Sequence, residues 1–135
     1  VSEQAITCMK IDIEGAEPLV IGQFGDIPAT RLPSVVMFEY GGGGQRAGGA
    51  AGWQDKFFQG TLECVQTLSA VGFETLIVID SEASAIEQVV EVSTLSSPES
   101  LFGPTAEYGN IIACRGLPLP PDAIHTFCAQ FHGPE

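Results

Sequence analysis

The chain has 135 residues, of which 44% are hydrophobic, enough for one domain with a buried core. Its 17 acidic residues outnumber 5 basic ones, and a net charge of −12 disfavours binding to nucleic acid or to anionic membrane surfaces. The sequence has no secretory signal and no apolar run long enough to span a membrane, so the cytoplasm is only the default location.

The four cysteines form no C-x-x-C pair, so the pattern indicates no zinc site and no metal ligand is assigned. Three of them lie in apolar patterns, where buried free thiols are the commonest outcome, although disulfides stay open.

In chain order, residues 5–13 are predicted to form a strand and residues 16–24 a helix. Apolar residues at positions 9, 11 and 13 alternate with polar ones, which is the period of an extended chain. Gly15 suits the tight turn that must follow, and Pro18 suits the first turn of a helix. Asp12 and Glu14 are expected on the same side of the strand, at its carboxyl end.

The remaining pattern alternates strands, helices and loops. Residues 35–40 are an almost uninterrupted apolar run, typical of a strand covered on both faces. The glycine-rich residues 41–52 match neither G-x-G-x-x-G nor the P-loop pattern, so we interpret them as a flexible insertion. The other predicted elements are a loop at 25–33, a helix at 53–71, a strand at 75–79 before Asp80, a short helix at 81–92, a loop at 93–109, a strand at 110–114 and a closing helix at 122–131.

This alternation predicts an α/β fold with a mostly parallel sheet. In such a sheet, ligands bind outside the carboxyl ends of the strands. Asp12 and Glu14, Glu39, the glycine run and Asp80 are therefore expected together at one end of the sheet. The loops at 25–33 and 72–74 and the C-terminal tail are expected at the other end.

The motif KIDIEGAE at residues 10–17 closely resembles the K-[IV]-D-[IV]-E-G-x-E signature of FkbM-type S-adenosylmethionine-dependent methyltransferases. PSVVMFEY at residues 33–40 resembles the next strand of that family, which also ends in an acidic residue. The resemblance covers roughly residues 5–80, is weaker at 108–115 and is absent beyond 116. It implies that residues 1–115 are the C-terminal half of a Rossmann-like class I methyltransferase domain, with strands equivalent to the fourth to seventh and the last one antiparallel. Residues 116–135 would be a tail.

The resemblance further implies that Asp12, Glu14 and Glu39 line the junction of methyl donor and acceptor as catalytic residues. Asp12 would also contact S-adenosylmethionine. Carboxylates suit this chemistry because they attract a sulfonium ion and can accept the acceptor's proton. From spacing alone, capping of the following helix by Asp12 and Glu14 is the commoner role. A divalent metal ion on the three carboxylates is a weaker alternative.

Neighbouring residues have competing interpretations too. Lys10 is expected either to pair with a carboxylate on the adjacent strand or to orient Asp12, with the structural role favoured. Glu17 is interpreted as a favourable interaction with the helix dipole. His125, Cys128 and His132 have the spacing of a possible ligand stripe, but packing is the commoner role for such a stripe. Trp53, Phe57 and Phe58 could form the walls of an acceptor pocket, but such residues more often belong to the core.

The glycine-rich turn and second-strand acid that hold the donor in class I methyltransferases have no counterpart in this sequence. If the resemblance holds, we expect about a hundred residues of a typical domain to lie upstream of this sequence. We therefore expect a part of a larger enzyme that methylates a hydroxyl of a small molecule or sugar, and that alone binds the donor weakly or not at all. Self-association through an unpaired first strand is a further expectation. Two alternatives are a non-catalytic α/β interaction module and a hydrolase that uses Asp12 and Glu39.

Overall fold

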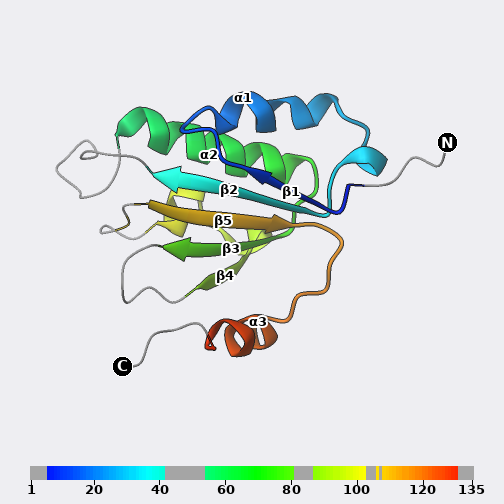
Figure 1. Ribbon diagram of the computed structural model, residues 1–135, viewed down its shortest axis with the longest axis vertical. Coiled ribbons are helices and arrows are strands. Elements are labelled where there is room, and N and C mark those ends of the chain that lie inside the picture. The colour runs from blue at the N-terminus through cyan, green and yellow to red at the C-terminus, as the bar shows by residue number, and fades with distance from the viewer. Residues whose placement is uncertain (1–5, 42–53, 81–86, 103–105, 107, 131–135) are drawn as a thin grey trace.

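A computed structural model of the chain shows an open α/β sheet with helices packed against it (Figure 1). The structure describes residues 6–41, 54–80, 87–102, 106 and 108–130. The strands in these ranges are β1 (Cys8–Ile11), β2 (Val35–Gly41), β3 (Thr75–Asp80), β4 (Gln88–Glu91) and β5 (Tyr108–Cys114). The helices are α1 (Glu17–Ile21), α2 (Asp55–Ala70) and α3 (Pro121–Cys128), with short 3₁₀ helices η1 (Gly22–Asp26), η2 (Ala29–Arg31), η3 (Val92–Thr94) and η4 (Pro98–Leu101).

The sheet is mixed, with the strand order β1-β2-β5-β3-β4. β1 and β2 pair in parallel, whereas β5 is antiparallel to both of its neighbours and β4 is antiparallel to β3. The prediction of a mostly parallel sheet is therefore wrong, because most neighbouring strands pair in the antiparallel direction. The last strand is antiparallel, as expected, but it lies in the middle of the sheet between β2 and β3.

β1, β2 and β3 nevertheless run in the same direction, because β5 is antiparallel to both β2 and β3. They end together at what we call the carboxyl end of the sheet, where Asp12, Glu39 and Asp80 lie, as predicted. The loops at 25–33 and 72–74 lie at the opposite end, as predicted, and β5 leaves the sheet there. The prediction that the C-terminal tail lies at that end is wrong for α3, because its His125 contacts Glu87, which precedes β4 beside the carboxyl end of β3. The residues after Gly41 and Asp80 that were expected at the carboxyl end lie outside the described ranges.

The short helix predicted over residues 81–92 is wrong where the structure describes it. Gln88–Glu91 form β4, with Val89 opposite Ile77 and Val90 opposite Leu76 of β3. The apolar pattern there is compatible with both periods, and the two β-branched valines pack well against a neighbouring strand. Pairing with β3 thus prevails over a weak helical pattern, whose first residues, 81–86, lie outside the description.

The other predicted elements are present with shifted boundaries. β1 stops at Ile11 rather than residue 13, and α1 gives way to the 3₁₀ helix η1 after Ile21. β5 starts two residues earlier than predicted, at Tyr108, and helix α3 is described over Pro121–Cys128. β5 ends next to the expected boundary between residues 115 and 116, and α3 occupies the tail.

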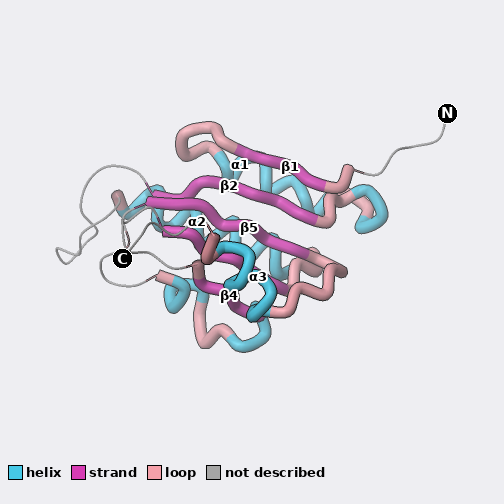
Figure 2. The backbone as a smooth tube through the Cα atoms, turned by 60° about the horizontal axis from the view of Figure 1, so that its bottom comes forward, coloured by secondary structure: helices cyan, strands magenta, loops and turns pink. Residues whose placement is uncertain are grey.

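The core lies between one face of the sheet and the helices α1 and α2. Figure 2 shows these two helices on one side of the sheet and α3 on the other. α2 carries an apolar stripe toward the sheet, as its periodicity of three to four predicts. The buried residues of this layer include Ile11, Ile21, Val36, Phe38, Tyr40, Leu62, Val65, Leu68, Leu76, Val78, Ile111 and Ala113.

The second face of the sheet is less covered, so the prediction that β2 is covered on both faces is wrong. Burial along β2 alternates, with Val36, Phe38 and Tyr40 buried and the residues between them only half-buried. In the described ranges, β1 pairs with β2 alone, which leaves one side of β1 without a neighbouring strand. The half-open apolar face of the sheet thus lies next to the side of β1 that has no neighbouring strand in the described ranges; we call this the free side of β1.

Candidate functional site: the carboxyl end of the sheet

The motif forms a tight turn between β1 and α1. The Ala16 N–H donates to the carbonyl of Ile13 at 3.3 Å, and Glu14 and Gly15 both have left-handed backbone, with φ of 56° and 93°. This conformation costs a non-glycine residue roughly 1–2 kcal/mol, so its surroundings must hold Glu14 in place. Because the strand ends at Ile11, the prediction that Asp12 and Glu14 lie on one side of a strand is wrong; Glu14 belongs to the turn.

Lys10 orients Asp12. Its Nζ donates to Asp12 Oδ2 at 2.6 Å, and the two side chains remain 57% and 45% exposed. This hydrogen bond raises the pKa of the Lys10 ammonium, and the charge of Asp12 raises it further. Glu39 on the adjacent strand acts on Lys10 more weakly, through its charge. The contact with Asp12 therefore prevails over the cross-strand pair that was favoured for Lys10.

Glu39 lies in a negatively charged environment. Its partial burial raises the pKa of its carboxyl group above the usual value, and the charges of Asp12, Glu14 and Glu17 raise it further. Lys10 opposes the shift but does not cancel it. The structure therefore brings the three predicted site residues into one electrostatic neighbourhood. Their catalytic roles stay a prediction.

The side chain of Glu17 stabilises the motif turn. Its side chain is buried, at 5% exposure, and its Oε1 accepts a hydrogen bond of 3.0 Å from the Ile13 N–H. The carboxylate of Glu17 therefore contacts the motif turn. The sequence predicted only an interaction with the helix dipole and did not indicate this contact. α1 starts after Ala16 without a hydrogen bond from any capping side chain, so the alternative in which Asp12 and Glu14 cap this helix is wrong.

The first turn of α2 packs against the motif turn. A Cβ atom placed on Gly15 would lie 2.1 Å from Cε1 of Phe57, so the backbone of Gly15 rests directly on that ring. Nζ of Lys56 lies 4.6 Å from the centre of the same ring, in a cation–π arrangement. Phe57 and Phe58 are half-buried and pack against the core, and Trp53 lies outside the described residues. The contact of Phe57 with Gly15 has no sequence signal.

Tyr40 and Asp80 form a second pair at the carboxyl end. The Tyr40 hydroxyl donates to Oδ2 of Asp80 at 2.7 Å. In the register of the sheet, both residues align with Gly109 of β5, so they lie on the helix-covered face. Glu39, the neighbour of Tyr40 along β2, lies on the opposite face because successive side chains of a strand alternate. Asp80 therefore does not join the carboxylates of the motif.

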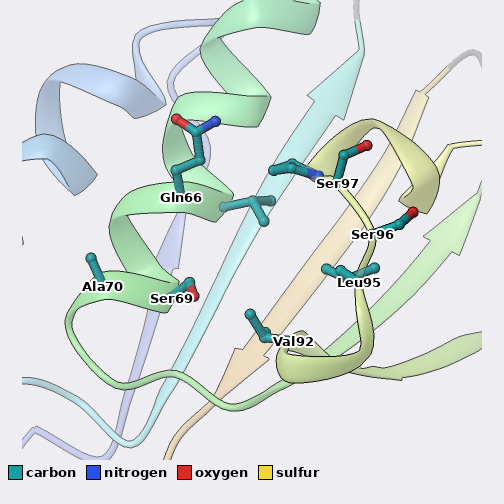
Figure 3. Close-up of a pocket in the computed structure, with 9 residues that line it drawn as sticks. Gln66, Ser69, Ala70, Val92, Leu95, Ser96 and Ser97 are labelled. Carbon is teal, nitrogen blue, oxygen red and sulfur yellow. The ribbon is translucent and has the colours of Figure 1, made fainter.

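A groove of about 330 Å³ lies between α2 and the segment that carries η3 and η4 (Figure 3). On the helix side, its lining comes from the last two turns of α2, far along the helix from Phe57. The whole lining contains no charged side chain and no predicted site residue. The lining residues are Val65, Gln66, Ser69, Ala70, Val92, Leu95, Ser96, Ser97 and Pro98.

On the side of the sheet opposite α1 and α2, α3 contacts the start of β4 through His125. Nδ1 of His125 lies 2.7 Å from Oε1 of Glu87, whose side chain is buried. The charge of Glu87 also acts on Cys128, one turn further along α3, although burial is the main reason that the pKa of this thiol is raised. His125 thus makes a polar contact with Glu87 while 43% of its side chain stays exposed, so the packing role expected for this stripe is not what the structure shows for this residue. His132 lies outside the described residues.

Within the described ranges, no group of three or more His, Cys, Asp or Glu side chains is arranged to hold a metal ion. The metal alternative for Asp12, Glu14 and Glu39 thus gains no support. The helices of this part of the chain include none with the length and apolar character needed to cross a bilayer. Comparisons with protein-family models, with curated proteins and with solved structures found no match.

Proposed function

We propose that the chain is the C-terminal, acceptor-side half of an S-adenosylmethionine-dependent methyltransferase domain. Asp12 and Glu39 lie where donor and acceptor would meet, and the acceptor group is a hydroxyl of a small molecule or sugar. The observation that carries the proposal is the position of the KIDIEGAE carboxylates. They gather at the carboxyl end of the sheet, where open α/β sheets bind their ligands.

The charge of this end suits the chemistry. Burial raises the pKa of Glu39 and three carboxylates raise it further, while Lys10, whose charge opposes this shift, is already hydrogen-bonded to Asp12. Such a surplus of negative charge would be relieved by a positively charged group such as a sulfonium ion. A carboxylate with a raised pKa is also a better base for the proton that the acceptor must lose.

The residues present fit the charge of S-adenosylmethionine but not all of its parts. The sequence offers no glycine-rich turn and no second-strand acid for the remainder of the donor. The free side of β1 and the half-open face of the sheet would allow another α/β unit to pack there and supply those contacts. When bound, the donor supplies the methyl group, while Asp12 and Glu39 supply charge and a proton acceptor.

The same free strand side favours a second candidate, a non-catalytic α/β interaction module. A strand side without a neighbour can pair with another chain whether or not a donor site exists. The two candidates differ at the carboxylates, because only the methyltransferase requires Asp12 to keep its charge.

Calorimetry with S-adenosylhomocysteine tests the proposal. We expect weak or no binding by this chain alone, and clear binding when a polypeptide with a glycine-rich donor-binding half is present. Binding in neither case would contradict the methyltransferase and favour the interaction module. Micromolar binding by this chain alone would contradict the assignment to a half-domain.

Substitution of Asp12 tests its role in the form that binds the donor. We expect Asp12→Asn to lower methyl transfer from labelled S-adenosylmethionine by roughly 100-fold or more, without change in Tm. Asp26→Asn is the matched control, because it removes the same charge from an exposed position in η1, toward the other end of the sheet. Full activity of the Asp12 variant would refute its assignment.

A further inference from the structure

The motif turn has three anchors to the rest of the fold. Ile11 fixes its first end, because the side chain is buried at 5% exposure. Glu17 fixes its second end through the hydrogen bond from Ile13. Between these anchors, residues 12–15 are exposed, and the ring of Phe57 is the surface on which Gly15 rests.

The contact of Gly15 with Phe57 leaves no room for a side chain at position 15 unless the Phe57 ring shifts. The φ of 93° at Gly15 disfavours a side chain, and an added Cβ would lie 2.1 and 2.6 Å from two ring carbons. The backbone of Gly15 therefore packs directly against the ring of Phe57, and this contact sets the distance between the motif turn and α2. Next to it, the Gly60–Pro18 approach brings α1 and α2 together in the same way, since a Cβ on Gly60 would lie 2.9 Å from Pro18.

We propose that Phe57 is a positioning residue of the candidate site: its ring holds the Gly15 turn and so sets where Asp12 and Glu14 stand relative to Glu39. Lys56 covers the ring and adds a cation–π contact on the outer side. The catalytic meaning of this arrangement rests on the proposed function, whereas the geometry does not.

The first test uses Glu39 as a reporter of distance. Neighbouring carboxylates contribute to its raised pKa, so the pKa of Glu39 should fall toward the usual value in Phe57→Ala if Asp12 and Glu14 move away. NMR titration of the side-chain carboxyl carbon measures this value in the chain as it exists. The amide signals of residues 12–17 should shift in the same variant.

Phe58 supplies the matched control. It is the next residue of α2 and also half-buried, but its ring packs edge-on against Phe102, at 6.0 Å between ring centres. Phe58→Ala removes similar packing and should leave the pKa of Glu39 and the signals of residues 12–17 nearly unchanged. Phe57→Leu keeps part of the bulk and serves if Phe57→Ala does not fold; its effect should be in the same direction and smaller.

The outcomes separate this inference from the proposed function. An unchanged Glu39 titration and unchanged turn signals in both Phe57 variants would refute the positioning role, whatever the chain binds. A lowered pKa without binding of S-adenosylhomocysteine in any form would support the positioning role and refute the methyltransferase. If both hold, Phe57→Ala should lower kcat by about 10-fold or more, and Phe58→Ala should not.

Discussion

Tyr40 reaches across an entire strand to donate a hydrogen bond of 2.7 Å to Asp80. The strand that it crosses is β5, and the residue between them in the register is Gly109. Glycine is required there, because an added Cβ would lie 2.8 Å from the Tyr40 hydroxyl and 2.1 Å from the carbonyl oxygen of Ile79. This bond ties the ends of β2 and β3 together over the strand that separates them.

Removing the hydroxyl should weaken the fold. We expect Tyr40→Phe to lower the free energy of unfolding by about 1–2 kcal/mol, because a partner of a carboxylate is lost while the ring stays buried. Urea denaturation measures the change. Tyr108→Phe removes the same group from a side chain that is 50% exposed, and it should have an effect near zero. Equal effects of the two variants would contradict the importance of the bond to Asp80.

Filling the space at Gly109 should be costlier. Gly109→Ala places a methyl group against the backbone of β3 and against the Tyr40 hydroxyl, and we expect a loss of roughly 2 kcal/mol or more. Gly25→Ala is the control, since a Cβ there meets nothing within 4 Å. Similar midpoints of urea denaturation for the two variants would show that β3 and β5 can separate without cost.

Gly15 and Phe57 should be energetically coupled. Gly15→Ala suffers both from its left-handed φ and from the collision with the ring, but only the collision disappears when Phe57 is also replaced by alanine. We expect the double variant to be more stable than the sum of the single losses predicts, by about 1 kcal/mol. A double-mutant cycle from urea denaturation measures this coupling, and strict additivity would mean that the two residues do not press on each other.

Glu39 should make stability depend on pH. Its pKa in the folded chain lies above the ordinary value of 4.5, first because of burial and then because of nearby carboxylates. Ionisation of Glu39 therefore costs stability at neutral pH, and the cost disappears once the pH falls below 4.5. Glu39→Gln should raise Tm at pH 7 but not at pH 4. Glu63→Gln, on the exposed surface of α2, removes the same charge elsewhere and reports the effect of net charge alone.

The cysteines should differ sharply in reactivity. All four are free thiols; Cys8 is exposed, whereas burial, more than the charges of Glu17 and Glu63, raises the pKa of Cys64 to about 12. At pH 8, iodoacetamide should modify Cys8 within minutes and leave Cys64 intact until the chain is unfolded. Mass spectrometry of peptides identifies the modified residues, and early alkylation of Cys64 would mean that the core opens readily.

The sequence indicated the parts of the fold that depend on local pattern. The apolar stripe predicted α2, the alternation before Gly15 predicted β1, and the common direction of β1, β2 and β3 brought Asp12 and Glu39 to one end. These features follow from periodicity and from the geometry of parallel strands.

The rest depends on partners that are distant in the sequence. Residues 88–91 become a strand only because β3 lies beside them, and β5 joins β2 and β3 through a register that no local pattern specifies. The same is true of the hydrogen bond between Tyr40 and Asp80 and of the contact between Gly15 and Phe57. The two residues of the Tyr40–Asp80 pair are 40 positions apart, and those of the Gly15–Phe57 pair are about as far apart, so no local pattern reveals either contact.

The central place of β5 has a consequence for biosynthesis. β1 and β2 are made before β3 and β4, but in the sheet of the described residues the two pairs meet only through β5, which follows all of them in the chain. A chain still emerging from the ribosome therefore holds two separate strand pairs with exposed inner sides until residues 108–114 have left the exit tunnel. Completion of the sheet is thus a late event, and a premature stop before β5 would release a product prone to aggregation.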